Sequence, residues 1–390
     1  MSGTEPVTGQ RAGQVLPLYA AGFVTAFGAH SIAAGLGAYT GFASLLALGL
    51  LLAVYDGAEV VLKPVFGAVT DRIGPRPVLF GGLLAFAAAS AAFVFAGDPA
   101  AVGLARFGQG AAAAAFSPAA GTLVARLAPD SQHGRAFGSY GAWKALGYAL
   151  GPVLGGVLIT FGGFDLLFGT LAGLALAVLA WAALAVPAVP PLPRTRQTLF
   201  DLARRLAAPG FLRPTAALAG ATAALAVGVG FLPVVGAVGG LGPLATGAAV
   251  SVLAATAALV QPWAGRARDA GRLPDVPGMA GGLAVAVVGL LVAAVVPGLL
   301  GVLVAAVAIG FGTGVVTPLG FAHLAASTPR ERLGQTMGSA EVGRELGDAG
   351  GPLLVGVLAA AASLGWGLTG LAVVLSMLVV ALWVGTATHR

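Results

Sequence analysis

Long apolar runs separated by short polar stretches make up almost the whole chain of 390 residues. A helix that spans a membrane needs roughly 20 mainly apolar residues. The pattern predicts twelve such helices, in two groups of six. The first group lies near residues 15–39, 43–66, 77–97, 99–125, 136–160 and 164–187, and the second near 213–237, 243–263, 277–297, 299–325, 335–361 and 364–386.

The composition agrees with this pattern. Hydrophobic residues make up 58% of the chain and charged residues only 9%, with a mean hydropathy of +0.95. Soluble domains are about 45–50% apolar and about 25% charged, so this chain has too little polar sequence to cover a surface in water. We therefore expect an all-α membrane protein, in which helices satisfy their own backbone groups.

A break rich in proline and arginine, residues 188–212, separates the two groups of helices. We interpret it as a linker between an N-terminal bundle, 1–187, and a C-terminal bundle, 213–390. Lys and Arg gather in the tails, the linker and alternate loops. The positive-inside rule then places both termini and the linker in the cytoplasm of a multi-pass cell-membrane protein. The same distribution accounts for the net charge of +6 without a nucleic-acid partner.

The two halves resemble each other. "GRAFGSYGAWKALGYALGPVLGGVL", residues 134–158, and "GQTMGSAEVGRELGDAGGPLLVGVL", residues 334–358, are identical at 12 of 25 positions with a constant offset of 200. A weaker likeness joins "KPVFGAVTDRIG", residues 63–74, to "QPWAGRARDAGR", residues 261–272. We infer a duplicated six-helix unit, and such repeats place a substrate site near the membrane midplane between the halves.

The polar stretch "GAVTDRIGPRP", residues 67–77, resembles the loop motif between helices two and three of the major facilitator superfamily. "RFGQG", residues 106–110, resembles the helix-four motif of that family. "GYALGPVLGG", residues 147–156, resembles the helix-five motif of its antiporter branches, particularly the twelve-helix drug–proton antiporters. In the loop, Pro75 replaces a usual basic residue. The positions that match the loop motif are Gly67, Asp71, Arg72, Gly74 and Arg76.

This resemblance covers essentially the whole chain. It implies the major facilitator fold, with two pseudosymmetric six-helix bundles. It also implies a secondary transporter that works by alternating access, draws on the proton gradient and uses no cofactor. We expect a monomer in the lipid bilayer that binds a small-molecule substrate and protons.

The loop motif can be interpreted physically. Gly67 and Gly74 permit a tight turn and close helix approach, while Arg72 and Arg76 hold the loop on the cytoplasmic side. The Asp71 carboxylate can accept hydrogen bonds from a helix N-terminus, where the helix dipole favours an anion. The resemblance implies that this aspartate latches the halves, using the helix that starts near residue 334. The alternative is an ordinary polar turn.

Ionisable residues inside predicted spans cost roughly 2.5–3.5 kcal/mol each at a helix centre, so they usually face the protein interior or a watery cavity. Two spans carry most of them, and in each span the spacing places them on one helix face. They are Asp56, Glu59 and Lys63 in 43–66, and Glu341, Arg344, Glu345 and Asp348 in 335–361. We expect the proton carrier among Asp56, Glu59, Glu341 and Asp348.

Charge pairs can couple protonation to gating. Asp56, Arg344 and its repeat equivalent Lys144 each lie about 15 Å from the cytoplasmic edge at 1.5 Å per residue. We expect Asp56 or Glu59 to pair with Arg344 in one conformational state, so that protonation weakens the pair. Alternatively, Arg344 is neutralised by acids of its own helix or contacts substrate. Lys144 is either a substrate contact or a counter-charge.

The remaining candidates are weaker. The family motif ties Arg106 to proton transfer, although a structural bond to helix-end carbonyls explains it equally well. The aromatic and histidine residues that could line a cavity, or simply pack, are His30, Tyr55, Tyr140, Trp143 and Tyr148. Proline removes a backbone hydrogen bond, so the predicted hinge residues are Gly147, Gly151, Pro152, Gly351 and Pro352.

These observations favour proton-coupled export of a small amphipathic or drug-like molecule. The alternative is uptake or exchange of a small anionic metabolite, with Lys144 and Arg344 as an anion clamp. A transport-inactive membrane scaffold is a third possibility. The sequence has no cysteines and no phosphate-binding Walker loop, and neither a metal-binding cluster nor an enzyme signature stands out.

Overall fold

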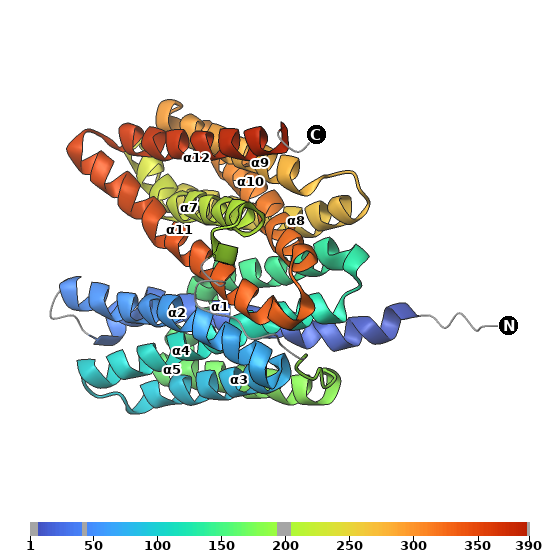
Figure 1. Ribbon diagram of the computed structural model, residues 1–390. Helices are drawn as coiled ribbons and strands as arrows, with labels where there is room; N and C mark the ends of the chain where they lie inside the picture. The colour runs from blue at the N-terminus through green and yellow to red at the C-terminus, as the bar shows by residue number, and fades with distance from the viewer. Residues whose placement is uncertain (1–6, 41–44, 193–203, 388–390) are drawn as a thin grey trace. The chain divides into compact units, whose positions relative to one another are not determined.

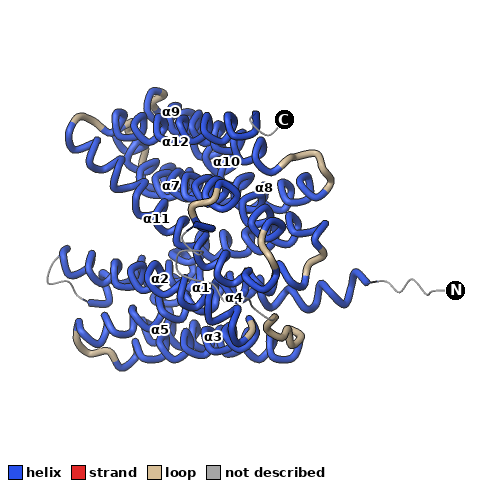
Figure 2. The backbone as a smooth tube through the Cα atoms, viewed as in Figure 1, coloured by secondary structure: helices blue, strands red, loops and turns tan. Residues whose placement is uncertain are grey.

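The computed structural model describes residues 7–40, 45–192 and 204–387. In these ranges the chain is helical, with short 3₁₀ turns and no strand (Figure 2). The helices, labelled in Figure 1, are α1 (Val7–Thr40), α2 (Leu45–Ile73), α3 (Pro75–Ala92), α4 (Pro99–Leu127), α5 (His133–Ala185), α7 (Pro209–Val238), α8 (Pro243–Asp269), α9 (Asp275–Val295), α10 (Gly298–Ser327), α11 (Leu333–Ala361) and α12 (Leu364–Ala387).

Helix α5 covers two predicted spans, 136–160 and 164–187. Its backbone leaves helical geometry at Gly162 and at Gly163, where φ is +69°. Glycine adopts a positive φ without the steric cost of a side chain, so this pair forms the corner between the two spans. Every predicted span falls on a helix, and the count of twelve depends on dividing α5 at this corner. Part of the predicted linker, residues 193–203, lies outside the described residues.

Eight stretches of the described residues are long and apolar enough to cross a membrane. They fall on α1, α3, α5, α7, α8, α9, α10 and α12. Helix α11 is not among them, because its four ionisable residues between positions 341 and 348 lower its hydropathy. The predicted all-α, multi-pass membrane architecture is confirmed.

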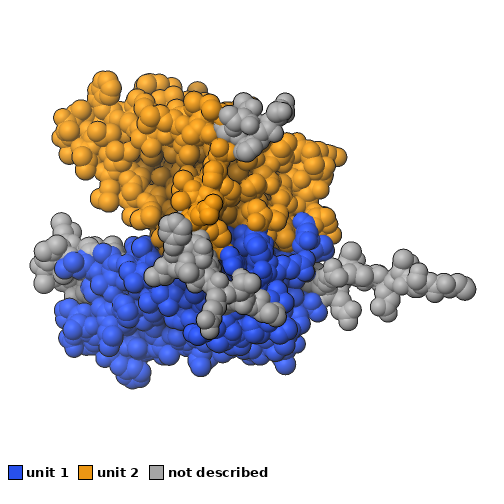
Figure 3. Space-filling view, in the orientation of Figure 1, with its two compact units in different colours: residues 1–130, 143–193, 328–339 blue, residues 131–142, 194–327, 340–390 orange. Residues whose placement is uncertain are grey.

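The chain divides into two compact units, which Figure 3 colours separately. Unit 1 contains residues 1–130, 143–193 and 328–339, and unit 2 contains residues 131–142, 194–327 and 340–390. Helices α5 and α11 therefore each begin in one unit and continue in the other. The bundle boundaries inferred from the sequence stay a prediction.

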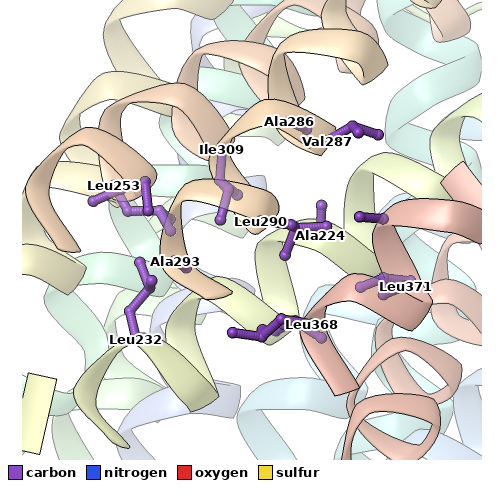
Figure 4. Close-up of a cluster of buried hydrophobic side chains, with 14 of the residues drawn as sticks. Ala224, Leu232, Leu253, Ala286, Val287, Leu290, Ala293, Ile309, Leu368 and Leu371 are labelled. Carbon is purple, nitrogen blue, oxygen red and sulfur yellow. The ribbon is translucent and has the colours of Figure 1, made fainter. Parts of the chain in front are cut away.

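Each unit is organised around one helix of the repeat. In unit 1, α4 packs against α1, α2 and α3, and nearly every residue from Ala112 to Ala125 is buried. In unit 2, the equivalent helix α10 packs against α7, α8 and α9. Leu253, Ile309 and Leu371 meet there in one apolar cluster (Figure 4). Small residues dominate both central helices, which suits close helix packing in lipid.

Two adjacent glycines on α9 test how much this close packing matters. A Cβ on Gly282 would lie 2.9 Å from the carbonyl oxygen of Gly312 on α10, whereas a Cβ on Gly281 would meet nothing within 4 Å. We expect Gly282→Ala to destabilise the protein by about 1–3 kcal/mol through overpacking. Gly281→Ala, the matched control, should be neutral or stabilising by up to about 1 kcal/mol. Thermal unfolding in detergent measures both, and equal shifts would contradict this interpretation.

Candidate functional site

Asp71 lies in the last turn of α2, not in a loop, and it contacts the first turn of α11 within unit 1. The two Asp71 carboxylate oxygens accept hydrogen bonds from the backbone N–H groups of Gly334 at 2.6 Å and Gln335 at 2.8 Å. Amides in the first turn of a helix have no acceptor within the helix, and the helix dipole favours an anion there. The contact expected from the sequence is therefore present, and its role as a latch stays a prediction.

Glycines bring these two helices into contact. A Cβ on Gly67 would lie 2.5 Å from the carbonyl oxygen of Gly334, so neither helix can approach this closely with a larger residue at that position. Gly74 ends α2 with φ +95°, a conformation that glycine adopts readily. Both glycines thus serve the purposes that the sequence predicts, close approach and a tight turn.

The two arginines of this motif, Arg72 on α2 and Arg76 on α3, have different surroundings. The Arg76 guanidinium donates to the carbonyl oxygen of Ala183 at 2.7 Å and lies over the Phe80 ring at 5.0 Å. Arg76 therefore ties the loop to the end of α5. Arg72, at the end of α2, is exposed.

A second aspartate makes the equivalent contact in unit 2. The Asp269 carboxylate, at the end of α8, accepts hydrogen bonds from the N–H groups of Gly134 at 2.8 Å and Arg135 at 2.7 Å, in the first turn of α5. Gly265 and Gly134 allow the close approach there. The sequence analysis missed Asp269 as a site residue. Its signal was the weak likeness of residues 63–74 to 261–272, which aligns Asp269 with Asp71.

Further polar contacts extend from Asp269. Arg268 bonds the Asp275 carboxylate with two nitrogens, at 2.7 and 3.2 Å, and lies 3.4 Å from Asp269. Nδ1 of His323 lies 2.9 Å from Asp275. The chain of contacts thus links α10 and α9 to the first turn of α5. The positions equivalent to Asp275 and His323 in the first repeat are Pro75 and Leu123, so this extension belongs to the second repeat.

A buried charge cluster lies between α2 and α4 in unit 1. Glu59 and Lys63 form an ion pair at 3.2 Å, with their side chains 10% and 1% exposed. The buried Arg106 guanidinium of α4 lies over the Tyr55 ring at 4.5 Å, and the charges of Asp56 and Glu59 act on it. Two acids and two bases thus share one membrane-embedded site on neighbouring helices, although Asp56 itself is exposed.

A neutral polar path continues from Arg106. Its guanidinium lies 3.5 Å from the side-chain oxygen of Gln109, and the Gln109 amide donates to Ser90 of α3 at 3.1 Å. All three side chains are buried. The path carries hydrogen-bonding groups from α4 to α3 through an otherwise apolar interior.

The ionisable residues of α11 also have neighbours on their own helix. Arg344 pairs with Glu341 at 3.2 Å and lies over the Phe321 ring at 5.9 Å. Glu341 is buried, Glu345 half-buried and Asp348 exposed. This pairing agrees with the alternative of local neutralisation for Arg344. The pairing of Asp56 or Glu59 with Arg344 stays a prediction.

The predicted cavity residues fall into separate groups. The His30 ring on α1 meets the Tyr148 ring on α5 edge-on at 4.3 Å, and Trp143 of α5 meets Phe23 of α1 at 6.4 Å. Tyr55 lies instead beneath Arg106. Tyr140 is buried within unit 2. The nearby Lys144 is buried as well.

The predicted hinge glycines are helix contacts. A Cβ on Gly151 would meet His30 and Phe27 of α1, and a Cβ on Gly351 would meet Ala223 of α7, all within 3.0 Å. Gly147 contacts α1 in the same way. Helices α5 and α11 continue through Pro152 and Pro352. Bending at these positions stays a prediction.

No group of His, Asp or Glu side chains among the described residues could hold a metal ion.

Comparison with protein families gives one match. The family model described as Major Facilitator Superfamily matches residues 18–298.

Curated relatives match shorter stretches. Multidrug resistance protein MdtG of Citrobacter koseri is 30% identical over 138 residues, which are 35% of this chain and 34% of that protein. Puromycin resistance protein pur8 of Streptomyces alboniger is 41% identical over 96 residues, 24% of this chain and 19% of that protein. Quinolone resistance protein NorA of Staphylococcus aureus is 28% identical over 111 residues, 28% of this chain and 29% of that protein. The chain thus matches about a third or less of each relative's length.

Solved structures share the fold along nearly the whole chain. The human organic anion transporter MFSD10 (TETRAN) has a TM-score of 0.78 at 18% identity, covering 96% of this chain and 100% of that one. The fucose:proton symporter FucP of E. coli has a TM-score of 0.79 at 13% identity, covering 95% and 97%. The fold class predicted from the sequence is confirmed.

The two aspartate contacts make separable predictions for hydrogen exchange. Asp71→Ala should accelerate amide exchange at Gly334 and Gln335 by about tenfold to hundredfold, because a hydrogen bond to a charged group contributes about 1.5–3 kcal/mol. Asp269→Ala should do the same at Gly134 and Arg135. Each variant serves as the control for the other. Acceleration at both helix starts in either variant would indicate general loosening instead of two local caps.

Proposed function

We propose that this chain, which belongs to the Major Facilitator Superfamily, exports a small amphipathic organic molecule in exchange for protons. Transport proceeds by alternating access of one site to the two sides of a cell membrane. The positive-inside distribution of Lys and Arg supports cytoplasmic termini. Export, substrate class and proton coupling are each separate parts of this proposal.

The observation that carries the proposal is the charge cluster on α2 and α4. Under the repeat alignment, Asp56, Glu59 and Arg106 correspond to Ala254, Ala257 and Ala306 of unit 2. Unit 2 builds the equivalent helices α8 and α10 without these charges, so the fold does not require them. Ionisable residues within a membrane are costly and commonly mark ion or proton pathways. Their presence in one repeat therefore supports a functional role.

The cluster can couple a proton to a change in electrostatics. With Asp56 and Glu59 ionised, the two carboxylates balance Lys63 and Arg106. Protonation of Glu59 removes its charge attraction to the buried Lys63, whose Nζ lies 3.2 Å away, and weakening a buried ion pair is costly. The protonated and the deprotonated cluster therefore differ in how strongly each stabilises a given conformation of the protein. A proton can drive a conformational cycle only through such a difference.

The relatives support export. Three of them are named for resistance to drugs, puromycin or quinolones. Removing such a compound from a cell protects it from the compound, whereas uptake does not. The scarcity of polar residues outside the charged positions suits an amphipathic substrate that makes few polar contacts.

Asp71 and Asp269 fit the role of gates in this cycle. Each carboxylate holds the first turn of a helix, α11 or α5, that continues into the other compact unit. Movement of one unit against the other then requires one or both first turns to be released. Two hydrogen bonds to each charged carboxylate make that release costly but reversible.

Anion exchange through Lys144 and Arg344 is the alternative. The Arg344–Glu341 pair weighs against it, because a carboxylate at 3.2 Å already neutralises the arginine. An anion clamp would need that pair to open when substrate binds.

Proton flux in liposomes tests the proposal. A pH dye inside reconstituted liposomes reports proton movement when lipophilic cations, neutral drugs, sugars or organic anions are added. We expect a drug-like compound to drive proton flux. Glu59→Gln should abolish this flux while the compound still binds, because the amide cannot carry a proton.

Matched variants sharpen the outcome. Asp165→Asn, at an exposed position on α5, removes an acid outside the cluster and should leave flux unchanged. Asp56→Asn reports whether the second acid of the cluster is needed. Proton coupling through Glu59 fails if Glu59→Gln transports and couples like the parent protein. Movement of anions alone, without protons and stopped by Arg344→Gln, would establish the exchanger instead.

A further inference from the structure

An apolar groove of about 830 Å³ runs along the surface of unit 1. It is lined by residues from Val78 to Ala92 on α3, by Phe95 and Ala96 beyond the end of α3, and by residues from Ala101 to Ala115 on α4, with the last turns of α2 closing one side. The exposed side chains of Phe95, Leu104 and Phe107 belong to its lining. We expect these exposed apolar side chains to face the hydrocarbon of the membrane.

The second repeat has a groove in the equivalent place, but a smaller one. It lies between α9 and α10 and measures about 430 Å³. At the constant offset of 200, Ala85 and Ala111 correspond to Val285 and Phe311, which line the smaller groove. On α9, Val288 and Val292 also stand where α3 has Ala88 and Ala92, whereas Val304 and Val307 on α10 are smaller than Leu104 and Phe107. The two repeats thus fill the equivalent space with different side chains.

The shape and lining of the groove favour a long apolar group. Along α3 the lining runs from Val78 to Ala92, about 21 Å at 1.5 Å per residue. An acyl chain is long, narrow and apolar. Drug-like ligands rely on a few polar groups for orientation, and every lining residue here is apolar.

One end of the groove lies beside positive charge. The lining residues Ile73 and Val78 lie close in sequence to Arg72, in the last turn of α2, and to Arg76, in the first turn of α3. Arg72 is exposed, and it follows directly after Asp71. Basic residues at a membrane surface attract anionic lipid headgroups. The apolar groove suits the acyl chain of a lipid, and the exposed Arg72 beside it suits a negatively charged headgroup.

We propose that this groove is a binding site for an anionic phospholipid. One acyl chain lies along α3 and α4, and the headgroup contacts Arg72. Binding to the folded protein stabilises it by an amount that rises with lipid concentration. The proposal does not depend on proton coupling or on the transported substrate.

Groove filling tests the acyl-chain part. Ala85→Val with Ala111→Phe introduces the side chains that the second repeat already carries at these positions. We expect native mass spectrometry of the delipidated protein to show affinity for phosphatidylglycerol reduced by about tenfold or more, because the larger side chains take the place of the acyl chain and remove its packing contacts. Ala177→Val with Ala180→Phe makes the same changes at exposed positions of α5 outside the groove. This control should bind phosphatidylglycerol like the parent protein, and thermal unfolding checks that both variants are folded.

Headgroup selectivity tests the other part. The parent protein should bind phosphatidylglycerol several-fold more tightly than phosphatidylcholine, and Arg72→Gln should abolish that preference while phosphatidylcholine binding persists. The proposal is overturned if the groove-filled, folded variant keeps full affinity for phosphatidylglycerol. It is also overturned if the parent protein binds both lipids equally, or if groove filling instead removes a dimer.

Discussion

The hydrocarbon interior of a membrane supplies no hydrogen bonds, so each polar group of a spanning helix needs a partner within the protein. The described chain meets this constraint at several levels. Backbone groups bond within helices, and hydroxyl groups such as those of Thr122 and Thr222 donate to the carbonyl oxygen four residues earlier, at 2.8 Å. Charged groups pair, as Glu59 does with Lys63. Any charge that stays in such an interior has to be balanced locally, and in the proposed mechanism a proton acts by changing that balance.

Close helix approach is the second consequence. Apolar side chains gain little by leaving lipid for another apolar surface, so association in a membrane relies on tight packing of small residues. Gly67 against Gly334, and Gly265 against Gly134, bring two helix pairs into backbone contact. Because these helices lie so close, the aspartate one turn after the glycine reaches the backbone N–H groups at the start of the facing helix. The glycine and the aspartate therefore depend on each other in both pairs, Gly67 with Asp71 and Gly265 with Asp269. A larger residue at the glycine position would push the helices apart and move the carboxylate out of hydrogen-bonding range.

The sequence predicted the parts of this structure that depend on local pattern. Apolar runs located every span, and the Asp71 loop located both its turn at Gly74 and its contact at Gly334. The sequence predicted a break between residues 160 and 164, and the corner of α5 at Gly162 and Gly163 lies in that gap. It did not identify the two glycines as the corner, because a glycine pair in apolar sequence indicates a bend only weakly.

Contacts between side chains far apart in sequence were harder to predict. Asp269 escaped notice because its surrounding motif has diverged, and the His323–Asp275 contact joins residues 48 positions apart on two different helices. Local neutralisation of Arg344 by Glu341 was one of several alternatives that helical spacing left open, and the structure contains that pair. The role of a residue in transport depends on how the protein moves and on which substrate it binds, and residue spacing in the sequence describes neither.

The differences between the two repeats show which features both units share and which occur in one unit alone. Both units keep a central helix rich in small residues, a glycine crossing and an aspartate that holds a helix start. Lys63 and Arg106 have Gln261 and Ala306 at the equivalent positions, so one repeat folds with these charges and the other without them. The second half carries its own membrane-embedded charges on α11, so the two repeats place such charges on different helices. Because such charges are costly in a membrane, their presence on α2 and α4 supports the proposed role of these helices in transport.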